Sequence, residues 1–453
     1  MPAFSLDPVQ TAWCAELRAM AAERLRPLAE KGEPGHVNRP LVAELGRLGL
    51  VRRLFSSGAL DLCLMRESLA YACTEAETAL ALQGLGAHPV HAYGTPAQRE
   101  RWLTPVSEGR AVAAFALSEP GAGSDAAALA LRAERDGAPD SGAGVSPLGD
   151  GGRRAGAGTH RDTPAAETRA DASRGEALGE VPEGGPRVDV PGAWPPPDAP
   201  GAASDGSSRW RLTGEKCWIS NAPEADFYTV FARTTPGAGA RGVTAFLVPA
   251  DRPGLTGTAL DMLSPHPIGA LAFDAVPVTA DDILGEPDRG FRVAMGTLNL
   301  FRPSVGAFAV GMAQAALDAT LAHTGQRDAF GGKLKDLQTV AHRVAELALR
   351  TEAARLMVYA AATAYDEDAP DVPKRAAMAK LLATETAQYV VDAAVQLHGA
   401  RALQRGHLLE HLYREVRAPR IYEGASEVQR GIIAKELYKE LCKEPVVETE
   451  VPR

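Results

Sequence analysis

Sequence patterns typical of helices occupy both ends of the chain, and patterns typical of strands occupy its middle. In the first 112 residues, apolar residues recur at spacings of three and four, which indicates amphipathic helices. From about residue 111, short apolar segments containing β-branched and aromatic residues alternate with polar turns, which indicates antiparallel strands. From Gly290 onward the helical spacing returns. Because 453 residues exceed what one hydrophobic core normally organises, we expect two or three domains.

The individual segments can be placed by residue number. The expected helices cover residues 11–28, 41–48, 61–71, 96–103, 337–347, 376–395 and 424–441. The expected strands cover residues 111–118, 128–135, 209–214, 226–234 and 242–250. Ser426 stands three residues before Gln429, so we expect a capping box at the start of the last helix.

Residues 137–208 differ from the rest of the chain. Gly, Ala, Pro, Asp and Ser dominate this segment, and Trp194 is its only aromatic residue. It cannot bury enough apolar surface to offset the entropy of ordering, so we expect a disordered insertion. Because the flanking segments both resemble strands, we place the insertion at the tip of a hairpin.

The composition argues against several classes of protein. The formal net charge is −9 with no Lys- or Arg-rich run, which argues against nucleic acid as a partner. We expect no apolar run long enough to span a bilayer and no secretion signal. The five cysteines lack metal-ligand spacing, so we expect neither a disulfide framework nor a metal site. We therefore expect a reducing compartment: the bacterial cytoplasm by composition, or the mitochondrial matrix in a eukaryote.

A glycine-rich turn follows the first expected strand. Residues 121–126, GAGSDA, formally match the dinucleotide-binding fingerprint, but Pro120 precedes them and strand-like sequence follows. A Rossmann site is therefore not expected, and the backbone freedom of a tight turn explains the glycines. The backbone N–H groups of this turn, with Ser118 and Ser124, would also suit a polar ring or a phosphate.

Three further motifs each allow a structural and a functional interpretation. Trp218, close to Ser220, is either a core residue, which its strand-like neighbourhood favours, or the wall of a site for a planar ligand. Arg327 either ends a helix or binds a phosphate through its guanidinium group. His398 is more often a structural hydrogen-bonding residue than a catalyst, and no nucleophile with matching spacing accompanies it.

Glu423 lies between Tyr422 and Gly424, just before the last expected helix. Most glutamates are solvated surface residues. The apolar and small neighbours of this one would instead raise the pKa of its carboxyl group toward the range of a general base. The residues alone leave both interpretations open.

Five motifs taken together resemble those of a known family. They are FALSEPGAGSD (115–125), GEKCWISNA (214–222), RDAFGGKLKDLQ (327–338), QLHGA (396–400) and IYEGASEVQR (421–430). In this order and approximate spacing they resemble the acyl-CoA dehydrogenase family over nearly the whole chain, apart from the insertion and the C-terminal tail. The resemblance implies an α+β fold whose parts follow in sequence order: an N-terminal helical domain (1–112), a middle antiparallel β domain (113–286), a C-terminal four-helix bundle (287–440) and a tail (441–453).

The same resemblance implies an activity and its residues. The family's reaction is FAD-dependent α,β-dehydrogenation of an acyl-CoA to the trans-2-enoyl-CoA by a homotetramer, with electrons passed to electron-transferring flavoprotein. Glu423 would remove the α-proton, and the β-hydride would go to flavin N5. The implied cofactor-binding residues are Phe115, Leu117, Ser118, Gly123, Ser124, Trp218, Ser220, Arg327, Phe330, Gln338, Gln396, Gly399, Ala425 and Glu427. The implied substrate-binding residues are Ser124, Asn299, Arg302, Tyr422 and Gly424.

The chain also departs from the family's pattern. Some members carry the base in the segment that corresponds to residues 297–304, which here contains no Asp or Glu, and this favours Glu423. Departures that put the acyl preference and the flavin affinity in question lie at Asn299, His323, Ala400, Ala425 and Glu427. Two alternatives remain: an acyl-CoA oxidase or other flavin oxidase of the same fold, and a non-catalytic, flavin-free scaffold or partner protein.

Overall fold

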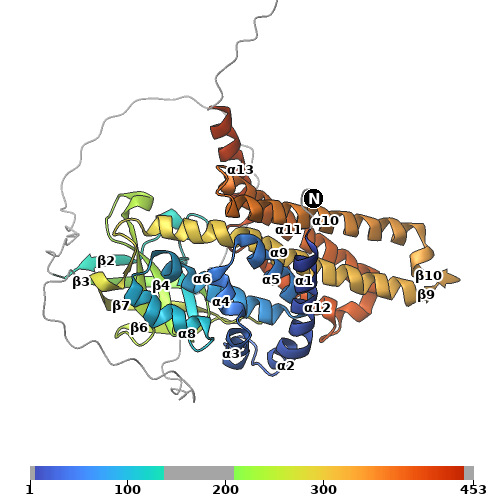
Figure 1. Ribbon diagram of the computed structural model, residues 1–453, viewed down its shortest axis with the longest axis horizontal. Coiled ribbons are helices and arrows are strands. Elements are labelled where there is room, and N and C mark those ends of the chain that lie inside the picture. The colour runs from blue at the N-terminus through green and yellow to red at the C-terminus, as the bar shows by residue number, and fades with distance from the viewer. Residues whose placement is uncertain (1–5, 137–208, 443–453) are drawn as a thin grey trace, which may run out of the picture. The chain divides into compact units, whose positions relative to one another are not determined.

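The computed structural model describes residues 6–136 and 209–442, which belong to one compact unit (Figure 1). The expected insertion at 137–208 lies outside the described residues, as do residues 443–453 of the expected tail. The order of helices, strands and helices agrees with the sequence prediction, and the acyl-CoA dehydrogenase-like fold class is confirmed. The domain limits at residues 112, 286 and 440 stay predictions.

The N-terminal part is helical. Its first helix begins at a capping box, in which the Gln10 N–H donates to the Asp7 carboxylate at 2.7 Å. The helices, with two π-helical turns (η1 and η2), are α1 (Pro8–Met20), η1 (Ala21–Leu25), α2 (Arg26–Ala29), α3 (Arg39–Arg47), α4 (Leu50–Ser56), α5 (Ala59–Ala72), α6 (Thr74–Tyr93), α7 (Pro96–Gln98), η2 (Arg99–Leu103) and α8 (Thr104–Ser107).

The middle part is a sheet whose described strands follow the order β6-β7-β3-β2-β4-β5-β8, with β1 paired to β4. The strands are β1 (Ala113–Ala116), β2 (Arg132–Arg135), β3 (Arg209–Ser220), β4 (Phe227–Arg233), β5 (Val243–Pro249), β6 (Leu255–Ala259), β7 (Ile268–Thr279) and β8 (Ile283–Leu284). Most pairs are antiparallel, but β1 runs parallel to β4 and Arg132 of β2 pairs in parallel with Arg233. The sheet is therefore mixed, because β1 joins it beside a strand that follows much later in the sequence.

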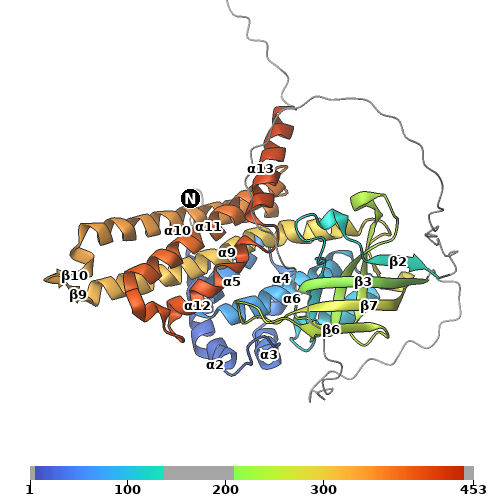
Figure 2. The ribbon, with the colours of Figure 1, turned by 180° about the vertical axis from the view of Figure 1, so that it is seen from behind.

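The C-terminal part is again helical, and α9, α10 and α11 lie side by side in both views (Figures 1 and 2). A short hairpin of β9 and β10 joins α9 to α10 at the end away from the sheet. The elements are α9 (Gly290–Gln326), β9 (Asp328–Ala329), β10 (Gly332–Lys333), α10 (Gln338–Asp366), α11 (Val372–His398), α12 (Leu408–Glu415) and α13 (Ser426–Leu441), with the 3-10 turns η7 (Gly399–Leu403) and η8 (Ala418–Arg420).

The two helical parts share one hydrophobic core. Buried apolar side chains of α5, α6, α9 and α11 form a single cluster with one face of the sheet, and a second cluster covers the other face. Along β4, Phe231 joins the first cluster and Val230 the second, which is the alternation of a strand buried on both faces. The helices at the two ends of the chain are therefore not independent domains in their packing.

The long helix α9 lies at the centre of this core. Among the described helices, it is the one that is long and apolar enough to cross a membrane, so the expectation that no run reaches that length is wrong on this criterion. However, 72% of its most apolar 18-residue window is buried. A Cβ atom at Gly311 would lie 2.4 Å from the Glu67 carbonyl oxygen, so α9 packs closely against α5. We therefore interpret α9 as a core helix.

The first prediction concerns the hairpin that carries residues 137–208. β2 and β3 are antiparallel partners, as the sequence predicted, and the Asp136 N–H donates to the Arg209 carbonyl oxygen at 3.0 Å. An Asn-Gly turn should therefore replace residues 137–208 without disturbing the sheet. We expect the shortened protein to keep the far-ultraviolet circular dichroism of its helices and a cooperative thermal transition. A non-cooperative transition would contradict this prediction.

Candidate active site

Glu423 lies on a sharp turn between η8 and α13. Its φ is +52° and that of Gly424 is +96°, so two successive residues adopt the left-handed conformation. The Glu423 side chain is half-buried, and its Oε2 atom is inaccessible and has no hydrogen-bond partner among the described residues. A strained backbone that carries a buried, unpartnered carboxylate oxygen is typical of a functional site.

Charges from three helices act on this carboxylate. Burial raises the pKa of Glu423, while Arg66 on α5, Arg302 on α9 and Lys380 on α11 act to lower it. Burial outweighs the cations, so the pKa remains raised above its ordinary value. Glu423 therefore has the environment of a general base.

Arg302 links α9 to the turn. Its Nε donates to the Glu423 carbonyl oxygen at 3.2 Å, and its Nη1 donates to Asn299 Oδ1 at 3.3 Å. The structure therefore brings together the expected base and two of the expected substrate-binding residues. Tyr422, on the other side of Glu423, is partly exposed and Gly424 is half-buried.

Arg66 is a site residue that the sequence interpretation missed. Its guanidinium is buried, ion-paired to the buried Glu77 of α6, and donates from Nη1 to Ser304 Oγ at 2.7 Å. Of the three cations, Arg66 lowers the pKa of Glu423 the most. The adjacent charged residues Arg66 and Glu67, in the middle of the mostly apolar helix α5, were the available signal.

The expected capping box at the start of α13 is wrong. Ala425 occupies the N-cap position without a side-chain hydrogen bond, and Ser426 is the first helical residue. The Ser426 Oγ instead donates to Glu385 Oε1 of α11 at 2.6 Å. Glu427 is exposed and pairs with Arg430 at 3.5 Å. A tertiary contact with α11 has replaced the local cap.

The motifs at residues 115–125 and 214–222 lie side by side, because β3 runs beside the segment that follows β1. The Cys217 N–H donates to the Ser118 carbonyl oxygen at 3.0 Å, and the fully buried Lys216 donates to the Leu117 carbonyl oxygen at 2.9 Å. Lys216 also pairs with Glu119 at 2.8 Å, which anchors the glycine-rich turn. Burial lowers the pKa of Lys216 to about 8.

Several residues beside this contact are open to a ligand. Trp218 is 49% exposed and its φ is +58°, so the ring is not the core residue of the structural interpretation. Ser124 is exposed, and nothing lies within 4 Å of a Cβ placed at Gly123. Ser220 is half-buried at the end of β3, whereas the Phe115 ring packs at 4.9 Å on Phe231. An uncovered Trp beside an open glycine turn fits the planar ring of a flavin.

The other expected cofactor residues lie at the far end of the helices, around the β9–β10 hairpin (Figure 2). Phe330 is 89% exposed with a φ of +54°. The ends of α9 and α11 meet there, and the stacked rings of His323 and His398 have their centroids 4.2 Å apart. The five expected cofactor residues at this end are all exposed: Arg327, Phe330, Gln338, Gln396 and Gly399. The structure does not bring these residues together with Trp218.

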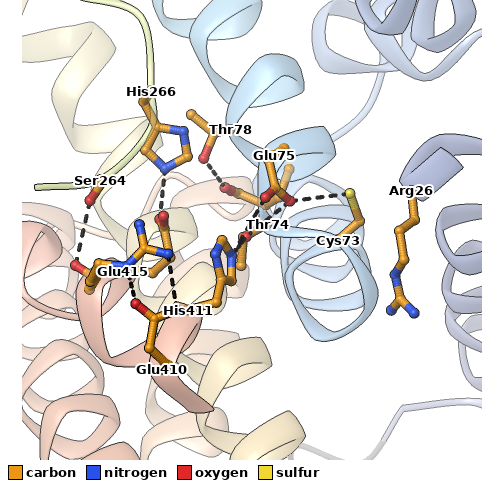
Figure 3. Close-up of polar contacts among 12 residues, drawn as sticks. Arg26, Cys73, Thr74, Glu75, Thr78, Ser264, His266, Glu410, His411 and Glu415 are labelled. Atoms are coloured by element: carbon orange, nitrogen blue, oxygen red, sulfur yellow. Dashed lines mark hydrogen bonds and ion pairs between the residues drawn. The ribbon is translucent and has the colours of Figure 1, made fainter. Parts of the chain in front are cut away.

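A second polar cluster ties the loop before β7 to α12. Figure 3 shows His266 and Glu415 pointing toward each other, with His266 Nε2 and Glu415 Oε2 2.6 Å apart. His411 and Thr74 make a neighbouring contact of 2.6 Å. Burial acts to lower the pKa of His266, but Glu415 offsets it and the pKa is raised. Burial acts to raise the pKa of Glu415, but His266 offsets it and the pKa is lowered.

Comparison with known families defines the class of protein. The models of the acyl-CoA dehydrogenase N-terminal, middle and C-terminal domains match residues 7–110, 199–276 and 288–438. The chain therefore belongs to the acyl-CoA dehydrogenase family, whose members are FAD-dependent oxidoreductases. The predicted family is confirmed.

Individual relatives agree with this assignment. The mitochondrial short-chain specific acyl-CoA dehydrogenase of Bos taurus is 32% identical over 419 residues, which cover 90% of this chain and 84% of that protein. The structure of butyryl-CoA dehydrogenase from Megasphaera elsdenii is similar with a TM-score of 0.75 at 27% identity, covering 96% of this chain and 99% of that chain. The structure of glutaryl-coenzyme A dehydrogenase with glutaryl-CoA has a TM-score of 0.75 at 26% identity, with 96% of each chain covered.

The second prediction tests the buried His266–Glu415 pair through stability. The raised pKa of His266 contributes stability that is full below its unfolded pKa and is lost as the pH rises through the folded pKa. The lowered pKa of Glu415 contributes stability above its unfolded pKa that is lost as the pH falls through the folded one. We therefore expect His266→Phe to lower the free energy of unfolding by about 3–5 kcal/mol near pH 6, and by less at pH 9.

The double variant His266→Phe, Glu415→Leu is the matched control. Because it removes both charges, it should regain part of the stability lost in the single variant. Chemical denaturation at pH 5, 6, 7.5 and 9 measures all three proteins. A loss that is the same at every pH would show that the ion pair is not its cause.

Proposed function

We propose that this chain catalyses α,β-dehydrogenation of an acyl-CoA thioester, with Glu423 as the base that removes the α-proton. The observation that carries the proposal is the buried Oε2 atom of Glu423, which has no partner in the described part of the chain and belongs to a carboxyl group of raised pKa. An α-proton of a thioester is weakly acidic, so its base has to be desolvated and aimed. The inaccessible Oε2 atom of Glu423 meets the first of these requirements.

The backbone of the same residue offers a second group. Within residues 6–136 and 209–442, no acceptor takes the N–H of Glu423. A donor beside the base is suited to the thioester carbonyl oxygen, where negative charge develops as the α-proton leaves. Arg302 and Asn299 lie next to it and would orient the thioester.

FAD is the cofactor that fits the site. The exposed Trp218, the open turn at Gly123 and the hydroxyl of Ser124 would hold the flavin ring and its polar edge. Bound FAD would supply the acceptor for the β-hydride, and electron-transferring flavoprotein is the proposed next acceptor. The uncovered Arg327, placed at the other end of the helices, would hold a phosphate.

The separation of the two groups of cofactor residues supports an oligomer. One chain supplies Trp218 at the sheet and Phe330 at the far hairpin, and the structure does not bring them together. A second copy would supply the missing half of each site, as in the homotetramer that we propose. Large exposed apolar side chains that such copies would cover include Phe330, Leu403, Tyr438 and Leu441.

The third prediction is that Glu423→Gln retains bound flavin but slows its bleaching by acyl-CoA at least about 100-fold, because the amide cannot accept the α-proton. Stopped-flow absorbance of the flavin, after anaerobic mixing with a panel of straight, branched and cyclic acyl-CoAs, measures the rate. Glu436→Gln is the matched control, because Glu436 also lies near the C-terminus, on α13, where it pairs with Lys439 at 3.0 Å.

Three outcomes separate the alternatives. Bleaching of Glu423→Gln at the wild-type rate would show that another group is the base. Oxygen uptake without electron-transferring flavoprotein would identify an oxidase. A wild-type protein that stays colourless with added FAD would identify the flavin-free scaffold.

A further inference from the structure

We propose that Lys380 and Gln429 are positioning residues for the base: they hold the carbonyl groups of Glu423 and Gly424 and thereby aim the Glu423 carboxylate. The inference rests on the function proposed above. Neither residue belongs to the motif positions assigned to flavin or substrate. Both are fully buried, at 0% exposure.

The hydrogen bonds of the turn show how it is held. The Glu423 carbonyl oxygen accepts from Arg302 Nε at 3.2 Å and from Gln429 Nε2 at 3.1 Å. The Gly424 carbonyl oxygen accepts from Lys380 Nζ at 2.8 Å and from Gln429 Nε2 at 2.9 Å. Glu423 and Gly424 both have a left-handed φ, so the backbone of the turn would relax without these donors. The donors therefore maintain the conformation that carries the base.

Gln429 also explains the glycine that follows the base. A Cβ atom at Gly424 would lie 2.3 Å from Gln429 Nε2, so no side chain fits there while Gln429 bridges the two carbonyl groups. The φ of +96° at Gly424 independently requires glycine. Glycine at position 424 and the hydrogen bonds from Gln429 to the two carbonyl groups therefore require each other.

The helix α11 holds the turn at three points. Glu385 pairs with Arg420 before the turn at 2.9 Å and accepts from Ser426 Oγ after it at 2.6 Å. Lys380, on the same helix, binds Gly424 between these two contacts. Rotation of the turn would break all three contacts, which makes α11 the frame against which Glu423 is aligned.

Lys380 adds a charge to this frame. In the described part of the chain, the Gly424 carbonyl is its one hydrogen-bond acceptor. Burial, together with the nearby Arg302, lowers the pKa of Lys380 to about 8. The carboxylates of Glu423, Glu385 and Glu427 act in the opposite direction, to raise this pKa. Below about pH 8 the ammonium stabilises the charged carboxylate of Glu423. Above it, that stabilisation is lost and the pKa of Glu423 rises.

The experiment compares Lys380→Met and Gln429→Met with Lys374→Met as the matched control. Lys374 also lies on α11, but it pairs with Glu440 at 2.7 Å near the surface, away from the turn. Stopped-flow bleaching of the flavin-loaded proteins gives the rate at saturating acyl-CoA, the apparent substrate affinity and their pH dependence. Hydrogen exchange of the Ile421 and Tyr422 amides, which donate to the Ala418 carbonyl oxygen at 2.8 and 3.1 Å, gives a readout that does not require turnover.

We expect both turn variants to lose about 10- to 100-fold in the saturating rate with little change in apparent affinity, because a displaced base still permits binding. In Lys380→Met the acid limb of the pH profile should move to higher pH, since Glu423 loses a stabilising cation. In Gln429→Met the limb should stay in place while the rate falls. Exchange of the Ile421 and Tyr422 amides should be faster in both variants and unchanged in Lys374→Met.

The outcomes that overturn the inference are distinct from those that overturn the function. A wild-type rate and pH profile in Lys380→Met, or the same defect in Lys374→Met, would show that Lys380 does not position the base. If the turn variants do not fold, the wild-type protein decides: exchange of the Ile421 and Tyr422 amides, corrected for the intrinsic pH effect, should increase between pH 7 and 9. Wild-type flavin that no acyl-CoA bleaches would instead refute the proposed function.

Discussion

The burial of one carboxylate among cations from three helices is the constraint on which the site depends. Glu423 is held on a left-handed turn, and its charge is balanced by Arg66, Arg302 and Lys380. A buried carboxylate without these cations would simply remain protonated, and a fully solvated one would be a weak base. The arrangement keeps the pKa above the ordinary value and still allows ionisation. General-base chemistry at neutral pH requires this balance.

The fold supplies this balance through packing between segments that are distant in sequence. Arg66 comes from α5, Arg302 from α9 and Lys380 from α11, and the apolar residues of these helices form one core. The core is therefore also the scaffold of the site: a shift of α9 against α5 would move Arg302 relative to Arg66. The sheet contributes a separate, more exposed surface around Trp218, where buried Lys216 and Glu119 anchor the glycine-rich turn. The proposed base and the proposed flavin-binding surface are thus built from different kinds of structure.

The sequence predicted the helix–strand–helix order, and it singled out Glu423 and Trp218 because motifs and periodicity are local properties. It did not predict Arg66 or Lys380, because nothing near a buried cation in sequence shows which carboxylate it will face. The capping box at Ser426 failed for the same reason: Glu385, on another helix, takes the hydroxyl group that the local pattern assigned to a cap. The parallel pairing of β1 with β4 is likewise a long-range contact that short-range strand signals do not encode.

The most direct test of the central claim is the exchange of the substrate α-proton with solvent. The protein is first reduced, so that hydride transfer is blocked, and is then incubated with a saturated acyl-CoA in D2O while NMR follows the α-hydrogen signal. The account predicts that the wild-type protein replaces the α-hydrogen with deuterium, that Glu423→Gln does not, and that the β-hydrogens stay in place. Exchange by Glu423→Gln at the wild-type rate would show that Glu423 is not the base.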